Sequence, residues 1–231
     1  MNQYNRGTLL SGIAIDGSRN VYIADFAHQR IQKFTSDGVP LMEWGTCGIN
    51  NGQFLFPSDI AADVFGNVYV TDTFNNRIQK FTSNGKFLMG WGSGGNGDGY
   101  FMGPLGIAID AAGNVYVADT HNHRVQKFTL NGGFLTKWGT YGCEVGQFDR
   151  PCGISIGTSG EIHVADDYGF RIQIFDMNGK FLDKWGRNND EQIKVPKGMV
   201  VDALGNVYIA DTMNNRIQKF TGLEAQRSSR R

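Results

Sequence analysis

The sequence has few cysteines, few prolines and no excess of charge of either sign. Cys47, Cys143 and Cys152 are the three cysteines in 231 residues, and this odd, widely spaced set argues against a disulfide framework and a cysteine-based zinc site. The 22 basic and 22 acidic residues give a formal net charge of zero. No overall electrostatic field therefore draws the chain to nucleic acid or anionic lipid.

Long hydrophobic runs are also missing, so no membrane span is expected. The first ten residues, MNQYNRGTLL, have neither the basic segment nor the apolar segment of a secretory signal. A hydrophobic content of 40% with 19% charged residues is typical of a soluble globular domain. We therefore expect a cytoplasmic protein with reduced thiols.

Glycine is abundant, with 32 residues against five prolines, and an internal repeat accounts for it. The segment GNVYVADTHNHRVQKF at 113–128 recurs in altered form at 19–34, 66–81, 160–175 and 205–220. One aspartate and one arginine recur in every copy, in steps of 47, 47, 47 and 45 residues. These residues are Asp25, Asp72, Asp119, Asp166 and Asp211, with Arg30, Arg77, Arg124, Arg171 and Arg216.

Each copy divides into four strand-like pieces. In the second copy, residues 59–63 are small, residues 67–72 and 77–81 alternate in polarity, and residues 86–91 end in an aromatic ring. Glycine and asparagine mark tight turns after the first and third pieces. Four-stranded antiparallel units at this period predict an all-β fold, a β-propeller whose blades bury both faces against their neighbours.

Two columns of the repeat fit that geometry. Where blades converge on the axis, one position of the first strand holds a small side chain in four copies: Ala14, Ala61, Ala108 and Ser155. Val200 is the larger exception in the fifth copy. Where blades splay apart, large rings can fill the wedge between them. Trp44, Trp91, Trp138 and Trp185 all stand at one place in the fourth strand, and we interpret them as core residues.

The phrases GNVYVADTxNNRIQKF, GxFLxxWG and GQFxxPxGIAID resemble the NHL repeat. The resemblance covers about residues 11–220, in four full copies and a partial fifth. It implies a six-bladed propeller that serves as a platform for protein or RNA, and related propellers include an amidating lyase. The zinc modules that precede these repeats in animal ubiquitin ligases have no counterpart here, so ligase activity does not carry over.

We divide the chain into blades at about 11–57, 58–104, 105–151, 152–196 and 197–220. A polar and basic tail at 221–231 is expected to be disordered. The fifth copy has no tryptophan and no counterpart of KFLMGWG, so three strands are expected there. Either the ring closes with five blades or these blades are part of a six-bladed ring. An unclosed ring would expose a strand edge and an apolar face, through which copies could self-associate.

One face of the propeller is expected to bind. The loops between second and third strands lie on the same face as the long linkers between blades, and functional loops on a rigid scaffold are a general expectation. Acidic residues outnumber basic ones in those linkers, which disfavours RNA and favours a protein or peptide partner. The predicted contacts are Phe26, Phe74, His121, His123, Tyr168, Phe170 and Met213; the alternative is that these side chains pack onto neighbouring blades.

The histidine pair in DTHNHR does not predict a metal site. His121 and His123 occupy slots that hold other residue types in the other copies, and no third ligand joins them, whereas zinc needs three or four. We expect no metal and no cofactor.

The repeated Asp and Arg are interpreted as structural clamps across the loop, with Asn122 taking an unusual turn conformation. Five copies of a pair do not form a catalytic site, which is normally single and asymmetric. The sequence therefore favours a non-enzymatic binding scaffold. An RNA-binding propeller is the alternative, and an amidating-lyase-like metalloenzyme is the third.

Overall fold

A computed structural model describes residues 12–186 and 193–221, which form five antiparallel sheets. The blades, in chain order, are β1 (Ile13–Ile15), β2 (Val21–Asp25), β3 (Arg30–Phe34) and β4 (Pro40–Trp44); β5 (Pro57–Ala62), β6 (Val68–Asp72), β7 (Arg77–Phe81) and β8 (Phe87–Trp91); β9 (Pro104–Ile109), β10 (Asn114–Asp119), β11 (Arg124–Thr129) and β12 (Phe134–Trp138); β13 (Pro151–Ile156), β14 (Ile162–Asp166), β15 (Arg171–Phe175) and β16 (Phe181–Trp185); and β17 (Pro196–Val201), β18 (Val207–Asp211) and β19 (Arg216–Phe220).

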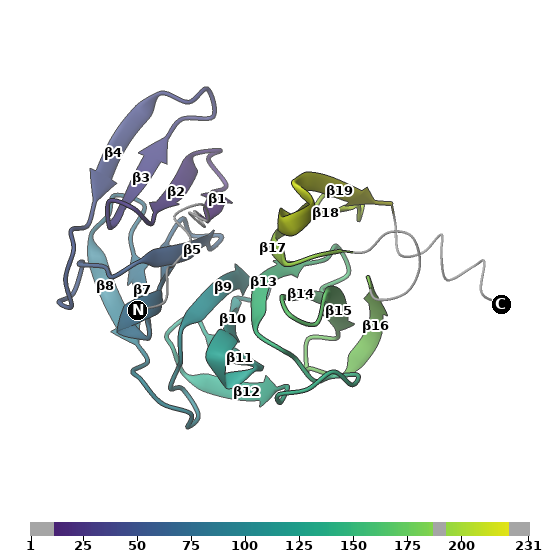
Figure 1. Cartoon of the computed structure of the whole chain (residues 1–231). Coiled ribbons are helices and arrows are strands. Elements are labelled where there is room, and N and C mark those ends of the chain that lie inside the picture. The colour runs from purple at the N-terminus through teal and green to yellow at the C-terminus, as the bar shows by residue number, and fades with distance from the viewer. Residues whose placement is uncertain (1–11, 187–192, 222–231) are drawn as a thin grey trace.

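The architecture is a five-bladed β-propeller with a three-stranded fifth blade, which confirms the predicted all-β fold class. The first strand of each blade lies toward the axis, and in blades 1 to 4 the fourth strand lies toward the rim (Figure 1). Blades 1 and 5 lie on either side of an opening in the ring (Figure 1). The predicted tail falls almost wholly outside the described residues.

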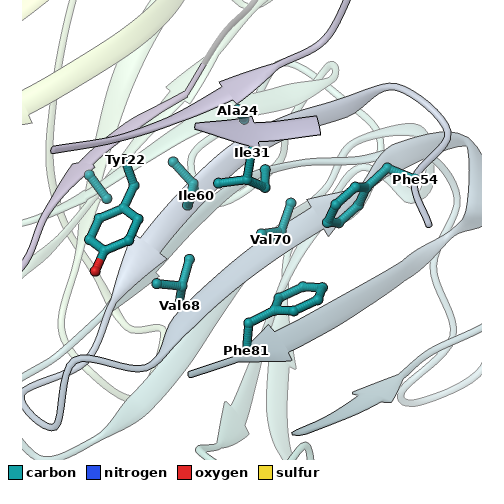
Figure 2. Close-up of a cluster of buried hydrophobic side chains, with 9 residues drawn as sticks. Tyr22, Ala24, Ile31, Phe54, Ile60, Val68, Val70 and Phe81 are labelled. Carbon is teal, nitrogen blue, oxygen red and sulfur yellow. The ribbon is translucent and has the colours of Figure 1, made fainter. Parts of the chain in front are cut away.

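Consecutive blades pack face to face. We call the side of a blade that points to the next blade along the chain its forward face, and the opposite side its backward face. Tyr22 and Ile31 on the forward face of blade 1 are buried against Val68 and Phe81 on the backward face of blade 2 (Figure 2). Alternation along each strand, with period two, supplies both faces from one sheet.

The tryptophan column also joins neighbouring blades. The Trp44 ring lies 5.9 Å from the Phe81 ring of blade 2, and a Cβ added at Gly85 in the blade 2 turn would collide with the indole. Trp91 and Trp138 repeat the arrangement over Gly132 and Gly179. The four tryptophans are half-buried and pack against the edge of the core clusters between the blades.

A hydrogen-bonded turn joins the first and second strands. In blade 2, Asp63 accepts the N–H groups of Phe65 and Asn67 and the hydroxyl of Tyr69, the last at 3.0 Å. Blade 4 replaces this aspartate, asparagine and tyrosine by Gly157, Glu161 and His163. His163 is fully buried, its Nε2 lies 3.5 Å from Glu161 Oε1, and burial lowers its pKa.

Within residues 12–186 and 193–221 the helical elements are three short 3-10 turns, η1 (Thr73–Asn75), η2 (Thr120–Asn122) and η3 (Thr212–Asn214). Each follows a second strand and leads into a third. In the described part of the chain, no helix has the length and apolar character needed to cross a membrane.

Candidate functional site

The repeated Asp and Arg form ion pairs in all five blades. Nε of the arginine lies 2.7 to 3.0 Å from Oδ2 of the aspartate. In blade 3, Asp119 also accepts the N–H of Met102 at 2.7 Å, while Arg124 donates to the carbonyl groups of Asn96, Gly97 and Tyr100. The pair therefore ties the loop between second and third strands to the linker that precedes the blade.

The turn residue in this loop differs from the prediction. Asn122 lies inside η2 and donates to Asp119 Oδ2 and to the Gly95 carbonyl. The left-handed residue is His123, with φ of 54°, because it closes the 3-10 turn with its N–H bonded to the Thr120 carbonyl. Gln29, Asn76, Phe170 and Asn215 take this conformation in the other blades.

The two histidines of the loop make different contacts. His123 Nδ1 accepts the N–H of Arg150 at 3.2 Å, and its ring lies 4.8 Å from that of Tyr141. His121 lies against Gly103, where an added Cβ would contact its ring. No group of three metal-ligating side chains occurs within residues 12–186 and 193–221.

The aromatic side chains of the loop face divide into two groups. Phe26 and Phe74 both contact the ring of Phe56, at 4.7 and 4.8 Å between centroids, and sequence analysis missed Phe56. On the other side, the guanidinium of Arg150 lies over the ring of Tyr168 at 4.9 Å. Phe74, Tyr168, Phe170 and Met213 are all exposed.

A cavity of about 330 Å³ lies at the axis, lined by the first strands of all five blades and by β18 and β19 of blade 5. Glycine recurs at one slot of these strands, because neighbouring strands approach closely there: a Cβ at Gly106 would collide with the Cys152 carbonyl. Gly12, Gly153 and Gly198 fill the same slot, but in blade 2 it holds Asp59. The axis thus carries one carboxyl that breaks the repeat.

Asp59 is held by three strands. Its Oδ2 accepts the N–H of Ile107 on β9 at 3.0 Å, its Oδ1 accepts that of Ile60 at 2.9 Å, and the carboxyl lies against Gly12 of blade 1. Burial raises the pKa of Asp59 to about 7, against the opposing effect of these two N–H groups. This carboxyl can therefore both accept and donate a proton near neutral pH.

A second departure from the repeat supports Asp59. The slot that holds alanine at 24, 118, 165 and 210 holds Thr71 in blade 2. Thr71 Oγ1 accepts the N–H of Asp59 at 2.8 Å and donates to its carbonyl at 3.2 Å. Two departures in direct contact indicate a local arrangement that this blade alone requires.

A further pair of departures meets between blades 4 and 5. Asp167 stands where Thr73, Thr120 and Thr212 stand in other blades, and Lys197, which lines the axial cavity, lies 3.8 Å from Asp167 Oδ2. Asp167 is buried, which raises its pKa, although Lys197 and then Arg150 oppose the shift.

At the junction of blades 4 and 5, Cys152 makes the hydrogen bond that the threonine at the position of Asp167 makes in blades 2 and 3. Thr73 and Thr120 each donate at 2.8 Å to the carbonyl of the proline that opens the next blade. At the blade 4 to blade 5 junction, Sγ of Cys152 donates to Pro196 O at 2.9 Å. Burial raises the pKa of this thiol, so it stays protonated and can donate. Asp167 is thereby released from that role.

Sequence analysis missed Asp59, Thr71, Cys152, Asp167 and Lys197 as site residues. It looked for functional residues among repeated columns and loop aromatics. The signal that finds them is a residue that departs from its column and changes chemical type.

Comparison with known proteins supports the fold. The NHL repeat family model matches residues 54–81, 101–128 and 194–220. The protein is an NHL-repeat β-propeller. A search of curated proteins finds no match. The matched segments of this NHL-repeat propeller run from the linker to the third strand, so the three described strands of blade 5 and the linker before them contain a whole matched unit.

Solved structures with the same fold include lyases. A streptogramin B lyase has a TM-score of 0.68 at 15% identity, with 91% of this chain and 68% of that chain covered. A catalytically inactive histidine-to-alanine virginiamycin B lyase from Staphylococcus aureus with quinupristin has a TM-score of 0.67 at 16% identity, covering 96% and 73%. A protein of unknown function from Bacteroides thetaiotaomicron has a TM-score of 0.70 at 17% identity, covering 90% and 58%.

These similarities contradict our prediction of a non-enzymatic scaffold. The lyases among them are enzymes on this propeller fold, so the fold and its repeated ion pairs give no ground for excluding catalysis. The prediction was wrong because it considered the residues that recur in every blade and not those that differ from their column in a single blade. The axial residues Asp59 and Lys197, in contrast, are not repeated, and catalytic arrangements are normally single and asymmetric.

Proposed function

We propose that this propeller is an enzyme of the lyase type that acts in its axial cavity. The observation that carries the proposal is Asp59, a carboxyl with a pKa of about 7 in a slot that is otherwise glycine. Lys197 supports it as a cation that lines the same cavity. The lyases that share the fold supply the reaction class.

The chemistry suited to these groups is elimination. Ionised Asp59 takes a proton from a carbon atom next to a carbonyl group, and the C–H electron pair becomes a carbon–carbon double bond. The substituent on the adjacent carbon leaves with its bonding electrons. Lys197 stabilises the negative charge that develops on the carbonyl oxygen, which is the electrostatic part of catalysis.

The substrate we propose is peptide-like and partly apolar. The first strands begin beside the ends of the second strands, as the pairs Pro57 with Asp72 and Pro151 with Asp166 show. The loop-face side chains therefore surround the end of the axis at which Asp59 and Lys197 lie. Phe74 and Tyr168 offer exposed aromatic surface there, and peptide-like ligands bind such surface.

Quinupristin and virginiamycin B are the first substrates to test. The products are separated by liquid chromatography and weighed by mass spectrometry. Opening a ring by elimination leaves the mass unchanged, whereas hydrolysis adds one water. We expect a ring-opened product of unchanged mass, with a rate that rises with pH through an apparent pKa near 7 as Asp59 ionises.

Asp59→Asn should reduce kcat by about 10²-fold or more, because general base catalysis contributes on that order. Lys197→Met should also reduce kcat, whereas Phe74→Ala should raise KM. Asp37→Asn, in an exposed turn of blade 1, is the matched control and should match wild type. Turnover that survives Asp59→Asn, or a product heavier by one water, would contradict the proposal.

A cytoplasmic location also remains a proposal. Cys47 and Cys143 are exposed and unpaired, and thiols in that state persist in reducing compartments. Fractionation of the native host, with this protein detected by antibody, tests it; recovery outside the cytoplasm would contradict it.

A further inference from the structure

The four interfaces between consecutive blades use the same columns of residues. The forward face contributes a small residue, an aromatic residue or histidine and an aliphatic residue, as Ala61, Tyr69 and Ile78 do in blade 2. The backward face of the next blade contributes aliphatic residues and a phenylalanine, as Ile107 and Phe128 do in blade 3. One half of the interface therefore specifies the other.

Two blade faces of this kind lie uncovered at the opening of the ring, the forward face of blade 5 and the backward face of blade 1. On the forward face of blade 5, Ile217 is 71% exposed, whereas Ile78, Val125 and Ile172 in the same slot are fully buried. On the backward face of blade 1, Ile13 is 63% exposed, whereas Ile60 in its slot is 3% exposed. Val200, the large exception in the small-residue column, lies on this uncovered forward face and is also exposed.

Polar contacts also recur at equivalent positions of these blade interfaces. Lys33, Lys80 and Lys127 of the third strands each reach a carbonyl in the turn of the next blade, at 2.9 to 3.2 Å from the oxygen atoms of Ser83, Leu130 and Met177. Lys219 occupies that slot in blade 5, and Ser36 occupies the turn slot in blade 1. The turn glycine of blade 1, Gly38, has no atom within 4 Å of an added Cβ, whereas Gly85 and Gly132 are covered by tryptophans.

We propose that the forward face of blade 5 binds the backward face of blade 1 in a second copy of this chain. The surface that fits the forward face is the backward face of an NHL blade, and the chain carries one such face uncovered. Within one chain the two faces lie across the opening (Figure 1). Lys219 of one copy donates to the Ser36 carbonyl of the other. Val200 and Ile217 of this forward face and Ile13 of the backward face also line the axial cavity, but the inference rests on their exposure and not on the proposed lyase reaction.

The contact is heterologous, because two different surfaces meet. Association therefore continues from copy to copy unless the geometry closes a ring. Each added copy repeats one interface of the kind already present between blades, so the assembly grows in steps of one chain.

Light scattering and sedimentation of the purified chain over a range of concentrations test the proposal. We expect the mass to rise from one chain in whole steps. Ile15 lies two positions after Ile13 on β1, on the same face, and is 66% exposed. Ile217→Asp blocks the forward face and Ile15→Asp blocks the backward face, and each should weaken association by about tenfold or more, because the charge would be buried in an apolar interface. Phe65→Asp, at an exposed turn position in blade 2, is the matched control and should associate like wild type.

Mixing the two blocked variants gives the decisive result. Ile15→Asp keeps an intact forward face and Ile217→Asp an intact backward face, so together they should form a 1:1 complex that grows no further. A single-chain mass at every concentration would overturn the proposal and leave the faces to a different blade-bearing partner. A mixture that shows no 1:1 complex, while both variants still aggregate, would overturn it as non-specific association.

Discussion

The hydroxyl of Thr71 is bonded to both main-chain polar groups of Asp59, accepting its N–H at 2.8 Å and donating to its carbonyl at 3.2 Å. Thr71 is fully buried, so it acts on the axial cavity through Asp59. It is a positioning residue. Asp59 in the glycine column and Thr71 in the alanine column depend on each other, because the alanine that the other blades have in place of Thr71 could make neither hydrogen bond.

Thr71→Ala should lower kcat by about tenfold with little change in KM, because a misplaced base loses rate more than binding. The pH–rate profile should also shift, since the surroundings of the Asp59 carboxyl change. Thr71→Ser keeps the hydroxyl and should restore both. Steady-state kinetics from pH 5 to 9 check this, and loss of thermal stability with an unchanged pH profile would indicate a purely structural role.

Asp59→Asn should stabilise the protein at pH 8 relative to wild type and have little effect near pH 4. The pKa of Asp59 is raised from 3.8 to about 7, so the folded state holds this proton more tightly than the unfolded state does. The stability that the group contributes is present below pH 4 and is lost as pH rises through 7. Each tenfold difference in proton affinity between the two states corresponds to about 1.4 kcal/mol.

Unfolding of wild type and Asp59→Asn by denaturant at pH 4, 6 and 8 measures this difference. A gap between the two unfolding curves that does not widen with pH would show that Asp59 ionises normally. Asp59 would then lack the raised pKa on which its proposed role as general base rests.

Arg171→Ala should cost about 3 to 5 kcal/mol, because it leaves the carboxylate of Asp166 buried without its cation. Both side chains of this pair are fully buried. Arg30→Ala should cost about 1 kcal/mol or less, since Arg30 in blade 1 is 30% exposed. Denaturation midpoints of the two variants, with His121→Ala as control, measure the contrast. Equal losses would mean that burial does not set the strength of these pairs.

The fold should lose stability in acid through His163. Burial lowers the pKa of this histidine from 6.5, so the unfolded chain takes up the proton more readily than the folded one. The contribution is therefore complete above pH 6.5 and is lost as pH falls below it. His163→Phe keeps an aromatic ring beside Trp185 and should unfold with a weaker dependence between pH 5 and 7. Parallel pH dependence of the two proteins would contradict this.

The sequence predicted the blades because each one repeats the same strand pattern, with Asp and Arg at fixed places. Because the pattern recurs five times it could be recognised, and its spacing of 45 to 47 residues indicated a β-propeller. The paired clamps could also be predicted, since Asp119 and Arg124 are five residues apart across one turn. The three strands of blade 5 follow in the same way from its missing tryptophan.

The axial site could not be predicted by that method. Asp167 and Lys197 are 30 residues apart and meet only because blade 5 packs on blade 4. The raised pKa of Asp59 depends on enclosure by strands of blades 1 and 3, which no local pattern reveals. The left-handed conformation of His123 was assigned one residue early because the length of the 3-10 turn was unknown.

The opening between blades 1 and 5 also sets the order in which the structure gives way. Blades 2, 3 and 4 are each held by two neighbours, but the terminal blades by one, and in repeat architectures stability is approximately a sum over such nearest-neighbour contacts. Within the described residues, blade 5 also has three strands where the other blades have four. Amide protons should therefore exchange first at β17–β19 and last in blade 3, so Asp59 lies on a blade that is held on both sides, whereas Lys197 lies on the blade that opens first.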